Sequence, residues 1–73
     1  MRTEQIFAER LREAMTDRGV GVYKLAEEAG VCFTTVYCWL RGERVPSGSL
    51  IPQLCRVLDV SADWLLGLRG YSS

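Results

Sequence analysis

The middle of the chain constrains the fold most, because its apolar spacing and its glycines indicate two short helices joined by a tight turn. Leu25 and Ala29 lie four residues apart on one helical face, and Gly30 follows them. Glycine supplies the backbone freedom that a sharp reversal of the chain needs. Val36 and Leu40 repeat the four-residue spacing after the turn. Two helices at a steep angle around a short glycine-containing turn form a helix-turn-helix, whose second helix can enter the major groove of DNA.

Apolar repeats and expected helix caps outside this motif predict three further helices. Phe7 and Leu11 lie four residues apart and predict an amphipathic first helix, which Thr3 is expected to cap. Ser61 is the expected cap of a short last helix over residues 62–66. The first helix and the two helices of the motif are expected to cover about residues 4–18, 22–29 and 33–41.

The start of the fourth helix depends on Pro52. A proline inside a helix costs about 3 kcal/mol, because it lacks an N–H and its ring clashes with the preceding turn. A helix that began at Ser47 would enclose Pro52, whereas a cap at Ser49 places Pro52 in the first turn, where no intrahelical hydrogen bond is lost. We therefore predict that the regular helix begins near Leu50.

The composition of the chain limits the classes of protein to which it can belong. The 73 residues suffice for one small domain, and no apolar run is long enough to span a membrane. No signal-peptide pattern is present, so we expect a soluble, cytoplasmic protein. The three cysteines are an odd number without zinc-ligand spacing, and the chain has no histidine. Because no catalytic constellation is visible either, we expect no enzyme, no cofactor and no metal site.

A longer pattern surrounds the motif. The run Leu-Ala-x-x-Ala-Gly-Val-x-x-x-x-Val-x-x-Trp-Leu-x-Gly at residues 25–42 resembles the lambda-repressor-like (Cro/XRE-type) helix-turn-helix domain. The likeness extends to the Phe-x-x-x-Leu pair at residues 7–11 and to Asp-Trp-Leu-Leu-Gly at residues 63–67. The resemblance implies a compact five-helix, all-α, DNA-binding transcriptional regulator. It predicts one domain over residues 1–67 and a C-terminal tail at residues 68–73.

The same resemblance implies which residues contact DNA. Threonine can hydrogen-bond at a base edge or set its methyl group against that of thymine, whereas phenylalanine makes apolar contact alone. Guanidinium groups and free N–H groups at a helix N-terminus both suit phosphate. The positions that match base-contacting residues are Phe33, Thr34, Tyr37 and Cys38. The positions that match phosphate-contacting residues are Arg41, Arg44, Ser47, Gly48 and Ser49.

The expected partner is double-stranded DNA, which the chain binds as a two-fold homodimer of repressor type. Such a dimer places two recognition helices in successive major grooves about 34 Å apart. The end of the chain is more apolar than the surface of a monomer needs, which favours a dimer contact there. The residues of this predicted dimer patch are Trp64, Leu65, Leu68 and Tyr71.

A second interpretation is a protein-interaction module of the same fold, of antitoxin or anti-repressor type, with weak or no operator binding. The formal net charge is zero, whereas DNA-binding domains usually carry a basic surface. Val22 stands where the family commonly has a glutamine that contacts the DNA backbone, and valine cannot make that hydrogen bond. Residues 31–56 nevertheless hold a small local excess of positive charge, with one acidic residue, Glu43, and three basic residues, Arg41, Arg44 and Arg56.

Overall fold

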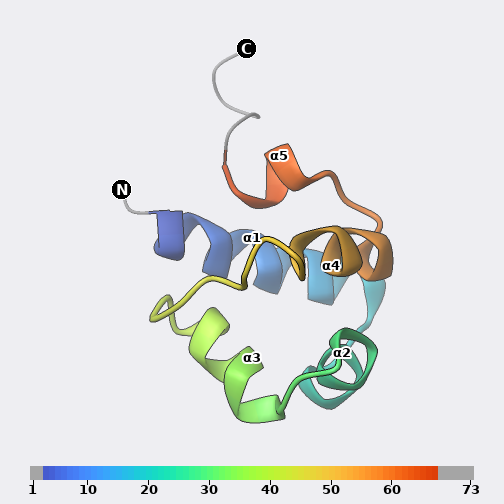
Figure 1. Ribbon diagram of the computed structural model, residues 1–73. Coiled ribbons are helices and arrows are strands. Elements are labelled where there is room, and N and C mark those ends of the chain that lie inside the picture. Colours follow the sequence, from blue (N-terminus) through green and yellow to red (C-terminus); the bar gives the residue numbers. More distant parts are fainter. Residues whose placement is uncertain (1–2, 68–73) are drawn as a thin grey trace.

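The computed structural model describes residues 3–67, which form α-helices joined by short loops, without a strand in that range (Figure 1). The five helices are α1 (Thr3–Arg18), α2 (Val22–Ala29), α3 (Phe33–Leu40), α4 (Ile51–Leu58) and α5 (Ala62–Leu65). The predicted all-α architecture of five helices is therefore confirmed. Within this part of the chain, no helix has both the length and the apolar character needed to cross a bilayer.

The long helix α1 is the element around which the others are arranged (Figure 1). It packs against α3, α4 and α5, while α2 packs against α3 and α4. In Figure 1, α2 and α3 lie below α1, and α5 lies above it. The helix-turn-helix and the last helix are thus on opposite sides of α1.

The core draws apolar side chains from all five helices, and no polar side chain is buried among residues 3–67. The ring of Trp39 from α3 meets the ring of Phe7 from α1 edge to face, with 6.3 Å between their centroids. The other largest fully buried side chains are Leu11, Leu25, Val36, Leu54, Leu58 and Leu65. Because α3 contributes to this core, its orientation is fixed by packing.

The turn between α2 and α3 has the conformation predicted from its glycine. Gly30 adopts φ 72° and ψ 32°, which is the left-handed region. The N–H of Val31 donates to the carbonyl of Ala26 over 3.0 Å and closes the end of α2. The reversal therefore depends on a backbone conformation that residues with a side chain avoid.

Gly30→Val is expected to lower the free energy of unfolding by about 1 kcal/mol or more, because β-branched residues avoid positive φ. Space is not the reason, since a Cβ atom at Gly30 would have no neighbour within 4 Å. Gly48→Val is the matched control, because Gly48 is equally open and does not have positive φ. Thermal and urea unfolding of both variants measure the difference. An unchanged midpoint for Gly30→Val would contradict the role of the turn.

Helix α4 begins as the proline argument predicts, at Ile51, so that Pro52 lies in its first turn. Its cap differs from the expectation, because Leu50 and not Ser49 is the N-cap residue and no side chain caps the helix. The hydroxyl of Ser49 lies 3.2 Å from that of Ser47, in the preceding turn.

Two other helix starts were predicted with a side-chain cap. Ser61 caps α5 as expected, since its hydroxyl accepts from the N–H of Trp64 over 3.2 Å. Thr3 is already the first residue of α1 and not the residue before it, so the expected position of that cap is wrong by one residue. Helix ends differ by this amount easily, because the terminal turn has few hydrogen bonds to hold it.

Candidate nucleic-acid interface

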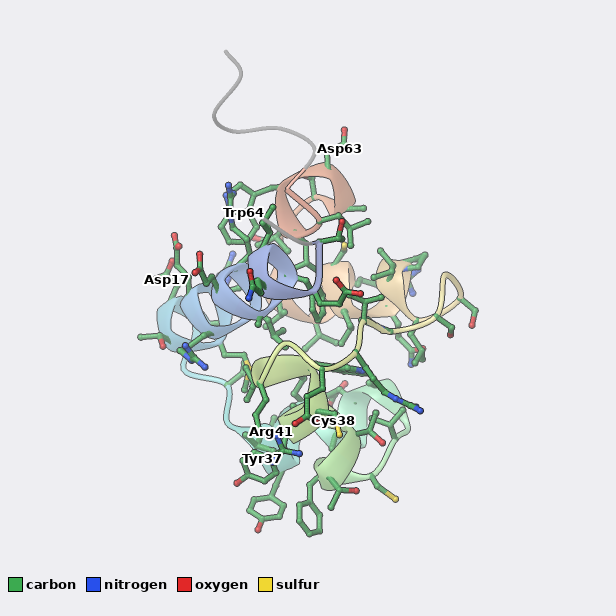
Figure 2. The ribbon with its side chains drawn as sticks, turned by 90° about the vertical axis from the view of Figure 1, so that its left-hand side faces the viewer. Asp17, Tyr37, Cys38, Arg41, Asp63 and Trp64 are labelled. Atoms are coloured by element: carbon green, nitrogen blue, oxygen red, sulfur yellow. The ribbon has the colours of Figure 1, made fainter. Side chains whose placement is uncertain are left out.

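Helix α3 has one side in the core and one side in solvent. Val36 and Trp39 are buried, whereas Phe33, Thr34 and Tyr37 are exposed. The predicted base-contacting positions are therefore accessible at the helix surface, with Cys38 half-buried beside them. Figure 2 shows Tyr37 at the end of the molecule opposite Trp64.

Three aromatic rings gather on this surface and form what we call the aromatic cluster, Tyr23, Phe33 and Tyr37. The centroids of Tyr23 and Phe33 lie 5.1 Å apart with their planes tilted by 50°. Those of Phe33 and Tyr37 lie 6.2 Å apart, edge to face at 86°. The three side chains remain 68%, 43% and 39% exposed. Sequence reasoning did not single out Tyr23, although an aromatic residue outside the apolar stripe of α2 is a signal that could have found it.

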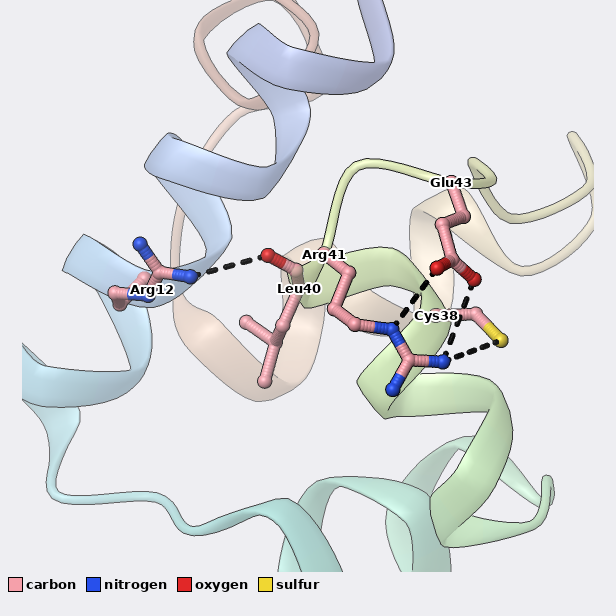
Figure 3. A network of polar contacts seen from close by, with 5 residues as sticks. All are labelled: Arg12, Cys38, Leu40, Arg41 and Glu43. Atoms are coloured by element: carbon pink, nitrogen blue, oxygen red, sulfur yellow. Dashed lines mark hydrogen bonds and ion pairs between the residues drawn. The ribbon is translucent and has the colours of Figure 1, made fainter.

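Arg41 follows α3 and is engaged by an acidic neighbour (Figure 3). Its Nε donates to Glu43 Oε2 over 3.1 Å, and its Nη2 donates to Glu43 Oε1 over 3.3 Å. The hydrogen bond and the charge of Glu43 raise the pKa of Arg41 above its ordinary value. Nη2 also lies 3.8 Å from Cys38 Sγ. Because both partners of this ion pair are exposed, a phosphate can exchange with the carboxylate at low cost.

Arg44 differs from Arg41 in having no ion pair or hydrogen bond to another residue in the range 3–67. It lies exposed in the loop between α3 and α4. The predicted phosphate-contacting residues Ser47, Gly48 and Ser49 are also exposed and occupy the turn just before α4. Pro52 removes one N–H from the first turn of α4, so that end of the helix has fewer donors for an anion than a proline-free helix.

Helix α1 holds the C-terminal end of α3 in place. Arg12 Nη2 donates to the carbonyl oxygen of Leu40 over 3.1 Å, as Figure 3 shows. A cation at the last carbonyls of a helix satisfies an acceptor without an intrahelical partner and suits the helix dipole. The contact fixes the end of α3 next to the loop that carries Arg41 and Arg44.

The predicted dimer patch needs correction. Leu65 is fully buried, so its assignment to a surface patch is wrong. The short helix α5 packs against both α1 and α4, which turns Leu65 into the core. Trp64 is half-buried, and the guanidinium of Arg10 lies over its ring, 4.9 Å from the centroid. Leu68 and Tyr71 lie outside the described residues, as does the predicted tail at residues 68–73.

A five-helix domain whose second and third helices form a helix-turn-helix with an accessible second helix defines a DNA-binding regulator. Residues 6–65 match the family described as "Helix-turn-helix domain". The chain belongs to this family, and the lambda-repressor-like (Cro/XRE-type) resemblance is confirmed.

A solved structure with the same fold is that of the restriction-modification controller protein C.AhdI from Aeromonas hydrophila. The two chains are 32% identical and superpose with a TM-score of 0.76. The match covers 85% of this chain and 94% of the controller protein. No curated protein matches the sequence.

Proposed function

We propose that the protein is a transcriptional repressor that reads an operator through α3 as a two-fold dimer. The observation that supports this most is the exposed side of α3, where Phe33, Thr34 and Tyr37 lie on a helix that the core holds in place. The similarity to a controller protein also favours a regulator over a module that binds protein only.

Affinity and specificity come from different residues in this proposal. Phosphate contacts supply sequence-independent affinity, and contacts to base edges supply specificity. Arg44 is available for a phosphate at once, whereas Arg41 must first leave Glu43. Thr34 and Phe33 then contact base edges, through the hydroxyl or methyl group of the first and the ring of the second.

Dimerisation compensates for the zero formal net charge of one subunit, in which only residues 31–56 hold a small local excess of positive charge. Two recognition helices about 34 Å apart fit successive major grooves on one side of the duplex. The proposed contact between subunits centres on Trp64 and includes Leu68 and Tyr71. Sedimentation of the protein with and without its duplex measures the stoichiometry, for which two chains per duplex are expected.

The test of the proposed function is selection of bound sequences from a random duplex pool at about 50 mM salt, where phosphate contacts are strong. Fluorescence anisotropy then compares the selected duplex with a scrambled one. A preferred sequence with approximate two-fold symmetry supports the operator-binding dimer. Failure to bind either duplex rejects the proposal and favours the protein-interaction module.

The two arginines are expected to differ when each is replaced. Arg44→Ala is expected to weaken binding to all duplexes alike. It is also expected to reduce the slope of the logarithm of the binding constant against the logarithm of the salt concentration by about 1. Arg41→Ala is expected to have a smaller effect, because Glu43 already neutralises that guanidinium. Anisotropy titrations on preferred and scrambled duplexes at two salt concentrations measure both. A loss confined to the preferred duplex would instead assign the arginine to a base.

Glu43→Gln tests the same ion pair from its other side. It is expected to strengthen binding to every duplex about twofold to fivefold, because it releases Arg41 and removes a negative charge beside the phosphates. Glu13→Gln is the matched control, since it changes the net charge equally at an exposed position of α1. Equal effects of the two variants would show that Glu43 acts only through the total charge.

A further inference from the structure

The aromatic cluster offers an apolar surface to a partner, because its three rings lie on the exposed side of the helix-turn-helix. Tyr23, Phe33 and Tyr37 are three of the four large apolar side chains that are exposed in the part of the chain described by the structure. Phe33 is at its centre, in ring contact with Tyr23 from α2 and Tyr37 from α3.

Phe33 has no hydrogen-bonding group, so it cannot distinguish the donors and acceptors of base pairs. The apolar group that base pairs present in the major groove is the C5-methyl group of thymine. 5-Methylcytosine carries a methyl group at the same ring position and keeps the amino donor of cytosine. A phenyl ring can make apolar contact with the methyl group of either base, and this contact is lost when the methyl group is absent.

We propose that the aromatic cluster reads C5-methyl groups, so that a pyrimidine with this methyl group is bound more tightly than the same pyrimidine without it. The proposal rests on the proposed function, because it requires α3 to face base edges. Phe33 contacts the methyl group, and the adjacent Thr34 adds its own methyl or hydroxyl group.

Tyr23 is a positioning residue in this arrangement. With 68% of its surface exposed it contributes little to the core, while its ring lies 5.1 Å from that of Phe33. Aromatic pairs prefer such tilted and edge-to-face arrangements. The ring of Tyr23 thus limits the positions that Phe33 can take before DNA arrives, which lowers the entropy lost on binding.

The test begins with the duplex that the wild-type protein prefers. Each thymine is replaced in turn by uracil, which keeps every hydrogen-bonding group of the base and lacks only the methyl group. At one or two positions the dissociation constant is expected to rise about fourfold, as for the exposure of one methyl group. At the same positions a C·G pair is expected to bind more tightly with 5-methylcytosine than with cytosine.

Variants assign the effect to the cluster. The quantity compared is the ratio of the dissociation constant for the uracil duplex to that for the thymine duplex. Phe33→Ala is expected to reduce this ratio to about one, and Tyr23→Ala is expected to lower it. Tyr23→Phe is the matched control, because it keeps the ring without the hydroxyl and is expected to retain the ratio. Thermal unfolding of Phe33→Ala and of the milder Phe33→Leu checks that each variant is folded; a ratio lowered in both supports the proposal.

The outcomes separate this inference from the proposed function. If every uracil-substituted duplex is bound as tightly as the unsubstituted duplex, methyl reading is overturned and the regulator proposal remains intact. Absence of binding to any duplex overturns both. A wild-type ratio in Phe33→Ala and Tyr23→Ala overturns the assignment to the cluster and leaves its rings to a protein partner.

Discussion

Trp39→Ala is expected to lower the free energy of unfolding by about 3–5 kcal/mol, the usual cost of truncating a buried large aromatic side chain. The side chain of Trp39 is 1% exposed and meets Phe7 edge to face. Its removal loses apolar burial and leaves a cavity between α1 and α3 that the backbone cannot close. Because a whole domain is stable by only about 5–15 kcal/mol, the variant is expected to be largely unfolded near its physiological temperature.

Urea unfolding followed by circular dichroism measures this loss. Trp64→Ala, compared at a protein concentration at which sedimentation finds monomers, is the matched control, because the same side chain is removed from a half-buried position on α5 and the proposed subunit contact does not contribute there. The control is expected to lose clearly less stability than Trp39→Ala. Equal losses would contradict the central place of Trp39 in the core, and they would assign comparable packing to α5.

Thr34→Ala is expected to weaken binding to the preferred duplex by about 1–3 kcal/mol, the range for one specific base contact. Binding to a scrambled duplex is expected to stay unchanged, because Thr34 is exposed on α3 and contributes nothing to the core. The preference at one or two base pairs is expected to relax at the same time. This pattern is opposite to that of Arg44→Ala, which weakens all duplexes alike.

Two further variants make the result specific. Thr34→Val keeps a methyl group and loses the hydroxyl, so it distinguishes a hydrogen bond at the base edge from apolar contact with thymine. Thr16→Ala on α1 is the control for loss of an exposed threonine elsewhere. Uniform weakening of both duplexes by Thr34→Ala would assign Thr34 to the phosphate backbone.

The elements that depend on local chain chemistry could be predicted from the sequence. The start of α4 follows from the missing N–H of Pro52, and the reversal after α2 follows from Gly30. The apolar stripes of the helices predicted most of the core for a similar reason, since helical spacing decides which side chains share a face. The five-helix architecture then followed from the resemblance.

The features that could not be predicted from the sequence depend on how the helices pack. Whether Leu65 faces solvent or the core is decided by α1 and α4 together, and spacing within four residues does not resolve it. The contact of Tyr23 with Phe33 joins two helices across the turn. The ion pair of Arg41 with Glu43 depends on the path of the loop after α3, which has no periodic pattern to read.

The two sides of helix α3 differ in what they contribute to the fold, and this has a consequence for how such regulators diversify. Val36 and Trp39 maintain the scaffold, while Phe33, Thr34 and Tyr37 contribute no buried side chain to it. Substitutions at these exposed positions are therefore expected to cost less folding stability than substitutions at Val36 or Trp39, and under the proposed function they change the target. Under the proposed function, relatives of this chain can share the five-helix fold and differ in the DNA sequence that they bind, and exchanging those few exposed side chains between relatives is expected to exchange the preferred sequence.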